Sequence, residues 1–306
     1  MIFRHEYLNG VWIDLEQPTE NEVRQIAQEF SVNERIEKEL LSPTPVPMVA
    51  GDEGMSLLVL HFPTQGSQDG ETKSQEVDFI VGKNFIITVR YEVVASIHHL
   101  KKLLETQQLV AKKTSVTTDT MLEVLFAHLY TSVRDHVNQV ADNLSRVEKD
   151  MFDGRERMTV RSISNISREF LHIEALLTGQ EESIVRFLDA LRRYEFFGPA
   201  FSERVVRILA ERTYTARVVG TFRAVATELR ETNVALLGAR QNEIMKTLTT
   251  VNFIFLPLGL ISWIFTMRTE GMPLIDSPNA FLIVLGIMLV VAALLITFFI
   301  KRRWLF

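Results

Sequence analysis

The sequence has no cysteine among its 306 residues. This absence excludes disulfide bonds and thiolate metal centres, and it is typical of a chain that stays in a reducing compartment. Any metal ligands must therefore be oxygen or imidazole groups. The first fifteen residues also lack an apolar stretch and include Arg4, Glu6 and Asp14, so we expect no signal peptide and a cytosolic location for the soluble part.

Several other features are scarce or missing. The formal net charge is only −5, which argues against a nucleic-acid partner and mildly favours the attraction of cations. The chain has no phosphate-binding loop, no Gly-x-Ser-x-Gly elbow and no helical His-Glu-x-x-His motif. We therefore expect that the protein is not an enzyme and that it has no resident cofactor.

Two long runs without charge dominate the C-terminal part of the chain. The apolar and charged fractions, 47% and 23%, are ordinary for a soluble protein, but residues 248–267 and 279–300 carry no charged side chain. Each run has about the twenty residues needed to cross a hydrocarbon core of roughly 30 Å. Two such runs in succession favour a pair of transmembrane helices over two buried core helices. Pro257 and Gly259 suggest that the first helix packs inside an assembly.

Charges beside these runs predict their orientation. Arg240 and Lys246 precede the first run, and the tail 301–306 begins with three basic residues. The intervening loop 268–278 has one basic and two acidic residues. Because cytoplasmic flanks carry an excess of Lys and Arg, we expect a multi-pass protein of the inner membrane, with both termini cytoplasmic and a periplasmic loop.

The rest of the chain changes from strand patterns to helix patterns. Residues 1–92 predict a small α/β subdomain, with strands at 10–15 and 56–62, a hairpin over 77–89, and a helix that starts near Thr19 and ends near Phe30. Residues 93–200 predict a helical subdomain with breaks at Asp153-Gly154 and Gly198-Pro199. The predicted fold class is thus an α+β cytosolic domain followed by a long stalk helix and two transmembrane helices.

The predicted stalk is a single helix over 201–267 that continues into the first span. Such a helix would be roughly 100 Å long and needs partners to cover its apolar stripe. Residues at steps of three or four form one stripe near its end, and copies placed side by side would put this stripe around a pore. The stripe consists of Asn242, Met245, Leu248, Thr249, Asn252, Leu256 and Gly259.

Two interpretations of the stripe remain open. Asn242, Thr249 and Asn252 could contact a hydrated ion, while the apolar positions form constrictions. The stripe could instead be a coiled-coil core in which asparagine fixes the register. Glu231, about three turns earlier on the same stripe, is either part of an acidic ring or one exposed charge among many.

The segment from Asn242 to Phe265 resembles the stalk-to-pore sequence of the CorA family of divalent-cation transporters. It shares the pattern Asn-Glu-x-Met-Lys-x-Leu-Thr and the run Ile-Phe-Leu-Pro-Leu. The strand pair over 81–89 and the tail 301–305 also resemble the family. The resemblance implies a homopentamer with a funnel-shaped cytosolic domain, embedded among membrane lipids, whose long helices line a pore for divalent cations.

The family ends its first span with a Gly-Met-Asn signature, where this chain has Thr266-Met267-Arg268. Only the methionine is kept. The loop that follows, which contains Glu270, is more similar to the zinc-transporting ZntB branch, and the chain most resembles CorA-like proteins without the signature, such as CmaX. The resemblance therefore favours Zn²⁺ as the transported ion, with magnesium, cobalt and nickel as alternatives.

Five arginines around a pore mouth would repel a divalent cation by several kcal/mol at an effective dielectric constant of about 20. We expect Arg268 to turn away from the pore and to pair with Glu270 or Asp276 of a neighbouring chain. The alternative is an interfacial arginine that meets lipid headgroups. A non-transporting membrane scaffold or sensor, and an anion-permeable pore, are the competing functions.

Metal sites outside the pore have weaker sequence support. Glu169 and His172 lie three residues apart on one helix face, which is a candidate zinc pair, although such pairs are common on solvated helices. The family binds a regulatory metal between protomers through acids near the start of the stalk. The nearest acid here is Glu203, and Arg207 occupies the expected position.

Overall fold

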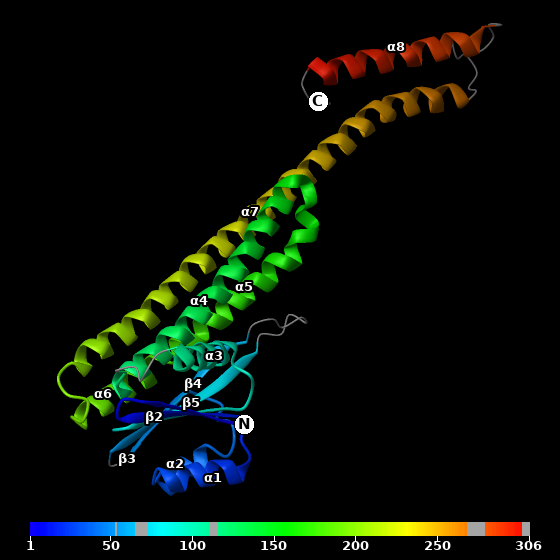
Figure 1. The fold of residues 1–306 in the computed structure, drawn as a ribbon. Coiled ribbons are helices and arrows are strands. Elements are labelled where there is room, and N and C mark those ends of the chain that lie inside the picture. The colour runs from blue at the N-terminus through cyan, green and yellow to red at the C-terminus, as the bar shows by residue number, and fades with distance from the viewer. Residues whose placement is uncertain (53, 65–72, 111–115, 268–278, 302–306) are drawn as a thin grey trace. The chain divides into compact units, whose positions relative to one another are not determined.

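The computed structural model describes residues 1–52, 54–64, 73–110, 116–267 and 279–301 (Figure 1). These residues form two compact units, Met1–Arg230 and Glu231–Phe306. The N-terminal unit contains a sheet covered by helices, and the C-terminal unit consists of long apolar helices. One helix, α7 (Phe201–Thr266), contributes residues to both.

A six-stranded sheet with the order β1-β2-β6-β5-β4-β3 is the centre of the N-terminal unit. Strands β2 and β6 pair in parallel and the other neighbours pair antiparallel. The strands expected at 10–15 and 56–62 and the hairpin over 77–89 are all present. The six strands are β1 (Ile2–Tyr7), β2 (Gly10–Glu16), β3 (Met48–Asp52), β4 (Met55–Pro63), β5 (Ser74–Gly82) and β6 (Phe85–Arg90).

One face of the sheet is covered by two short helices, α1 (Glu20–Glu29) and α2 (Glu34–Glu39). Helix α1 begins where the sequence predicts, because Thr19 and Glu22 form a complete capping box. Apolar side chains of both helices pack on alternate residues of the strands. This layer includes Val23, Ile26 and Ile36 from the helices and Ile13, Val59 and Ile80 from the strands.

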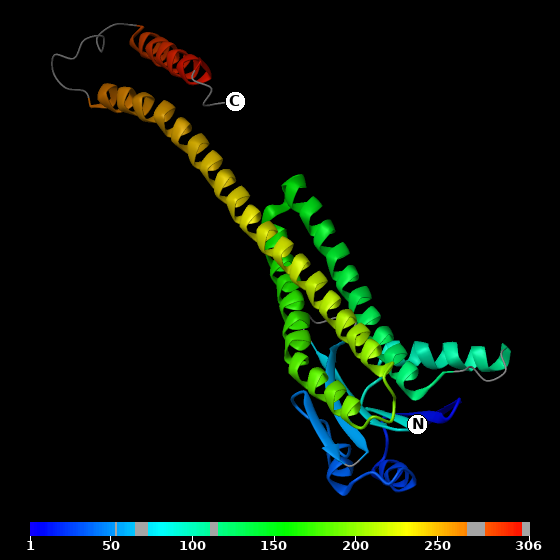
Figure 2. The same ribbon diagram turned by 90° about the vertical axis from the view of Figure 1, so that its left-hand side faces the viewer.

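The opposite face is covered by helices from further along the chain, α4 (Thr118–Asp150), α5 (Glu156–Gly179) and α6 (Glu181–Arg193) (Figure 2). The ring of Phe79 on β5 stacks on Phe126 of α4 with centroids 5.1 Å apart. Because both faces are covered, every residue of β4 is buried. The predicted α/β and helical subdomains therefore share one core and belong to one compact unit.

Glycine ends two of the helical segments. Gly154 has a φ of 87° within the turn that joins α4 and α5. Gly198 has a φ of 73° just before α7. Left-handed backbone of this kind is readily adopted by glycine, so the breaks expected at Asp153-Gly154 and Gly198-Pro199 are confirmed.

Buried charges connect the sheet to helix α3 (Ala95–Val110). Asp14 on β2 is fully buried and accepts from Arg90 of β6 and from Lys101 of α3, each at 2.9 Å. Arg90 also contacts Glu16 at 2.5 Å. Two cations and two anions thus offset one another in the core, and removal of either kind leaves a buried charge uncompensated.

Replacement of Asp14 by alanine should lower the free energy of unfolding by about 3–5 kcal/mol, because Arg90 and Lys101 lose their shared carboxylate. The control is Glu29→Ala, which removes an exposed pair with Arg4 and should cost under about 1 kcal/mol. Denaturant unfolding of the full chain in detergent, followed by circular dichroism, measures both. Equal losses in the two variants would contradict a stabilising role for the buried network.

The C-terminal unit contains the two predicted spans. Helix α7 ends at Thr266, one residue before the expected end, and α8 extends over Ala280–Lys301. They lie against each other, with the rings of Phe253 and Phe299 6.3 Å apart. Only 6% of the most apolar window of each helix is buried. So large an exposed apolar surface is unfavourable in water and fits a hydrocarbon environment.

Candidate functional site

The α8-facing side of α7 follows a helical spacing. Thr250 is 1% exposed, and Ile254, Leu258 and Ile261 are half-buried on the same side. Pro257 also lies half-buried there and, lacking an N–H, leaves the carbonyl group one turn earlier without its usual helical donor. The α8 residues that are at least half-buried share one face too, and they include Val284, Met288, Leu295 and Phe299.

Most of the predicted stripe is turned away from the Thr250 side of α7. At about 100° per residue, Asn252 is turned by about 200° and Leu256 by about 240° from Thr250. All the stripe residues remain accessible within the C-terminal unit. Asn242, Met245, Leu248, Asn252 and Leu256 are exposed, and Thr249 and Gly259 are half-buried. Helix α8 therefore leaves uncovered the surface that further copies of the chain would need.

The chemistry of this stripe is mixed. Asn242, Thr249 and Asn252 offer neutral oxygen atoms, whereas Met245, Leu248 and Leu256 offer only apolar surface. Gly259 adds no side chain. Glu231 is exposed, eleven residues before Asn242, which places it about 20° from that residue around the helix. Along a pore, residues of this kind can contact a hydrated cation at the polar positions and exclude water at the apolar positions.

The C-terminal end of α7 carries the start of the altered signature. The Thr266 hydroxyl donates to the Ser262 carbonyl at 2.7 Å, which keeps this side chain against the helix. Met267 is exposed immediately after the helix. Arg268 and Glu270 lie outside the described residues, so their predicted pairing stays a prediction.

The candidate zinc pair on α5 has another partner in the structure. Glu169 Oε1 lies 3.0 Å from Nε2 of His136 on α4. His172 Nε2 is buried and has no hydrogen-bond partner among the residues that the structure describes. Within the described ranges, no group of three or more His, Asp or Glu side chains could hold a metal ion. The spacing of Glu169 and His172 gave no indication of His136, which comes from the neighbouring helix.

Arginines at the start of α7 bind acids of α4. Arg204 Nε contacts Asp119 at 2.5 Å, and Arg207 Nε contacts Glu123 at 2.8 Å. Glu203, the acid that the sequence singled out, is exposed. The sequence alone did not reveal these pairs, because their partners are about 80 residues apart. At this end of α7 the acids of α4 are neutralised within the chain.

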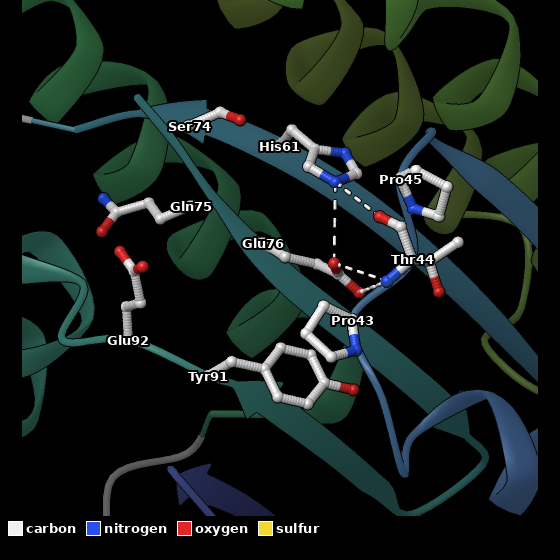
Figure 3. Close-up of a pocket in the computed structure, with 9 residues that line it drawn as sticks. All are labelled: Pro43, Thr44, Pro45, His61, Ser74, Gln75, Glu76, Tyr91 and Glu92. Carbon is white, nitrogen blue, oxygen red and sulfur yellow. Dashed lines mark hydrogen bonds and ion pairs between the residues drawn. The ribbon is translucent and has the colours of Figure 1, made fainter. Parts of the chain in front are cut away.

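A cavity of about 380 Å³ lies between the 43–45 loop, β4, β5 and the residues that follow β6 (Figure 3). Both oxygens of Glu76 accept from the Thr44 N–H, at 3.0 and 2.8 Å. His61 Nε2 lies 2.8 Å from the Thr44 carbonyl oxygen. Burial, with the nearby charges of Asp78 and Glu76, raises the pKa of Tyr91. No pattern in the sequence predicts this cavity.

A family model described as "CorA-like Mg2+ transporter protein" matches residues 9–302. A cobalt/magnesium transport protein CorA from Thermotoga maritima is 22% identical, covering 92% of this chain and 80% of the relative. Another protein of that name, from Methanocaldococcus jannaschii, is also 22% identical and covers 96% and 91% of the two chains.

Solved structures show the same fold. The complete CorA magnesium transporter from Methanocaldococcus jannaschii has a TM-score of 0.82 at 20% identity, covering 98% of this chain and 93% of that one. Full-length CmaX has a TM-score of 0.65 at 16% identity, covering 97% and 89%. The ZntB cytoplasmic domain from Vibrio parahaemolyticus has a TM-score of 0.51 at 14% identity, covering 74% and 91%.

Single cysteines can test whether the stripe faces water, because the natural chain has none. We expect Asn252→Cys and Leu256→Cys to react much faster with a water-soluble thiol reagent than their neighbours Val251→Cys and Phe255→Cys. Leu256 and Phe255 are 65% and 68% exposed in the single chain. Their side chains are therefore almost equally accessible, but they point to different sides of the helix. Labelling is measured by mass spectrometry on the protein in lipid vesicles.

Equal labelling within each neighbouring pair would show that the stripe does not line a water-filled path. Faster labelling of Val251→Cys and Phe255→Cys would place the pathway on a different face of α7.

Proposed function

Because this chain belongs to the CorA-like Mg²⁺ transporter family, we propose that it moves divalent metal cations across a membrane through a pore lined by α7. The observation that carries the proposal is the uncovered stripe on α7, which lies away from α8 and combines amide and hydroxyl oxygens with apolar side chains. Family membership and two apolar helices support the membrane location.

The proposed assembly is a homopentamer with a funnel-shaped cytosolic domain. Five copies would bring five stripes together around one axis. We propose that both termini are cytoplasmic and that the membrane is an inner membrane. This orientation is favoured by the basic residues that flank the two spans, which are Arg240, Lys246 and the first three residues of the 301–306 tail. The 268–278 loop would then be periplasmic.

The stripe residues have distinct proposed roles. Rings of Asn242, Thr249 and Asn252 oxygens would contact the hydration shell of the cation. Rings of Met245, Leu248 and Leu256 would close the path when water leaves them. A ring of Glu231 would raise the local concentration of cations before they enter.

Zinc is the proposed ion, with magnesium, cobalt and nickel as alternatives. The proposal rests on the sequence of the loop after Met267, which is similar to that of the ZntB branch. The structural likeness to the ZntB cytoplasmic domain is weak support, since it concerns the fold alone. The names of the two sequence relatives instead mention cobalt and magnesium.

Flux measurements distinguish the proposed function from its two rivals. The purified protein is reconstituted in liposomes, and Zn²⁺, Mg²⁺ and Cl⁻ fluxes are followed with fluorescent indicators, with and without a pH gradient. We expect cation flux, with Zn²⁺ faster than Mg²⁺. Chloride flux alone would favour an anion-permeable pore, and no flux of any ion would favour a membrane scaffold or sensor.

Two loop variants test the proposed pairing of Arg268. We expect Glu270→Ala to lower cation flux by about tenfold or more, because the released arginines would repel the cation and about 1.4 kcal/mol of repulsion already changes a rate tenfold. Arg268→Ala should change flux less. Strong acceleration in Arg268→Ala, with no effect of Glu270→Ala, would contradict the pairing.

A further inference from the structure

Two carboxyl groups lie next to each other on β5, and one of them, Glu76, lines the cavity of Figure 3. Glu76 and Asp78 are two residues apart, so both side chains point to the sheet face that α1 and α2 cover. Asp78 is 0% exposed and Glu76 is 8% exposed. Two buried carboxylates at neighbouring positions repel each other strongly unless one of them is neutralised.

Glu76 has the surroundings of a charged carboxylate. Its two oxygens accept from the Thr44 N–H at 3.0 and 2.8 Å, and Oε2 lies 3.6 Å from His61 Nε2. The His61 ring also meets the Thr44 carbonyl oxygen, and it can donate there only if Nε2 carries a hydrogen. Figure 3 shows these contacts converging on Thr44.

Asp78 has the surroundings of a neutral acid. Its Oδ2 accepts from the Tyr91 hydroxyl at 3.3 Å. Its Oδ1 is buried and, among the described residues, finds no hydrogen-bond donor. A buried carboxylate oxygen without a donor is costly, whereas a protonated oxygen beside Glu76 is itself a donor with an acceptor nearby.

Within the part of the chain that the structure describes, the groups around Asp78 do not supply a compensating positive charge. Glu76 lies on the same strand, Tyr91 follows β6, and Glu39 ends α2. His61 on β4 faces Glu76. Burial is the largest cause, and the neighbouring Glu76 the next, of a pKa of Asp78 well above the ordinary value for an aspartate.

We propose that Glu76 and Asp78 form a proton-binding site, in which Asp78 Oδ1 carries one proton and donates it to Glu76, and that this proton holds the 43–45 loop against the sheet. The site lies in the N-terminal unit, outside the stripe of α7. The proton site therefore goes beyond the proposed transport function, and each of the two proposals can be correct or wrong independently of the other.

Loss of the proton gives the pair a second buried negative charge. Glu76 lines the cavity and Asp78 is enclosed, so Glu76 is the partner that can move toward water. That movement removes the acceptor of the Thr44 N–H and leaves the contact between His61 and the Thr44 carbonyl group. Release of the loop should open the cavity at high pH and close it at low pH.

The sequence of the loop makes this release measurable by hydrogen exchange. Pro43, Pro45 and Pro47 have no N–H, so a peptide over 42–47 reports on Ser42, Thr44 and Val46 only. In the full chain in detergent, we expect Thr44 protection, corrected for intrinsic exchange, to fall by up to about tenfold for each pH unit between the ordinary aspartate pKa and the raised pKa of Asp78.

Asp78→Asn should keep Thr44 protected throughout, since its amide N–H donates to Glu76 permanently. Glu92→Gln is the matched control, because Glu92 lines the same cavity but is not a member of the pair, and it should keep the wild-type pH dependence. Protection that is independent of pH in the wild type, or equally pH-dependent in Asp78→Asn, would overturn the proposal.

Two further measurements complete the test. Infrared spectra of the wild type should show a protonated-carboxyl C=O band that disappears as the pH rises, and this experiment needs no variant to fold. Addition of Zn²⁺ or Mg²⁺ at high pH should not restore Thr44 protection. Restoration by either ion would show that the pair binds a metal cation and would contradict the proton site.

The same proton predicts how stability depends on pH. Because the raised pKa of Asp78 lets the folded chain keep a proton that the unfolded chain loses, stability should fall as the pH rises from the ordinary aspartate pKa toward the folded value. The fall should be smaller in Asp78→Asn. Unfolding of the full chain in detergent at a series of pH values measures the difference, and identical slopes in both proteins would contradict the site.

Discussion

The apolar surface of the C-terminal unit is the constraint on which the account of this protein depends. Helix α8 covers one side of α7, through Thr250 and its neighbours, and leaves most of both helices exposed. A membrane can accept that surface only where it is apolar. Asn252 is an exposed polar exception within the apolar part of α7, so it needs a partner or water. A pore built from several copies satisfies both requirements.

In the N-terminal unit, most buried charged groups are paired with groups of opposite charge within the same chain. Asp14 is paired with Arg90 and Lys101 inside the core, and arginines of α7 pair with acids of α4. Asp78 has no such cation among the described residues, and the proposed proton takes its place. The contrast suggests that most buried charges fix the fold, whereas the carboxyl pair on β5 can respond to its surroundings.

The sequence predicted the features that follow from local patterns. The capping box at Thr19, the central strands, the glycine breaks and both apolar helices all produce short-range signals. The sequence did not predict strands β1 and β3, which are the two edge strands of the sheet. An edge strand has a partner strand on one side only, and the alternation of apolar residues in these two strands is weak. The sequence did not predict the pair of Glu169 and His136 or the cavity beside Glu76, because both depend on contacts between elements far apart in the chain.

The central claim is that the stripe from Asn242 to Gly259 surrounds a pathway in an assembled protein. The most direct test is electron cryomicroscopy of the full chain in lipid nanodiscs. The account predicts five copies around an axis, with Asn252 and Leu256 of every copy directed toward it. Stripe residues that face lipid, or an assembly with no central path beside α7, would contradict it.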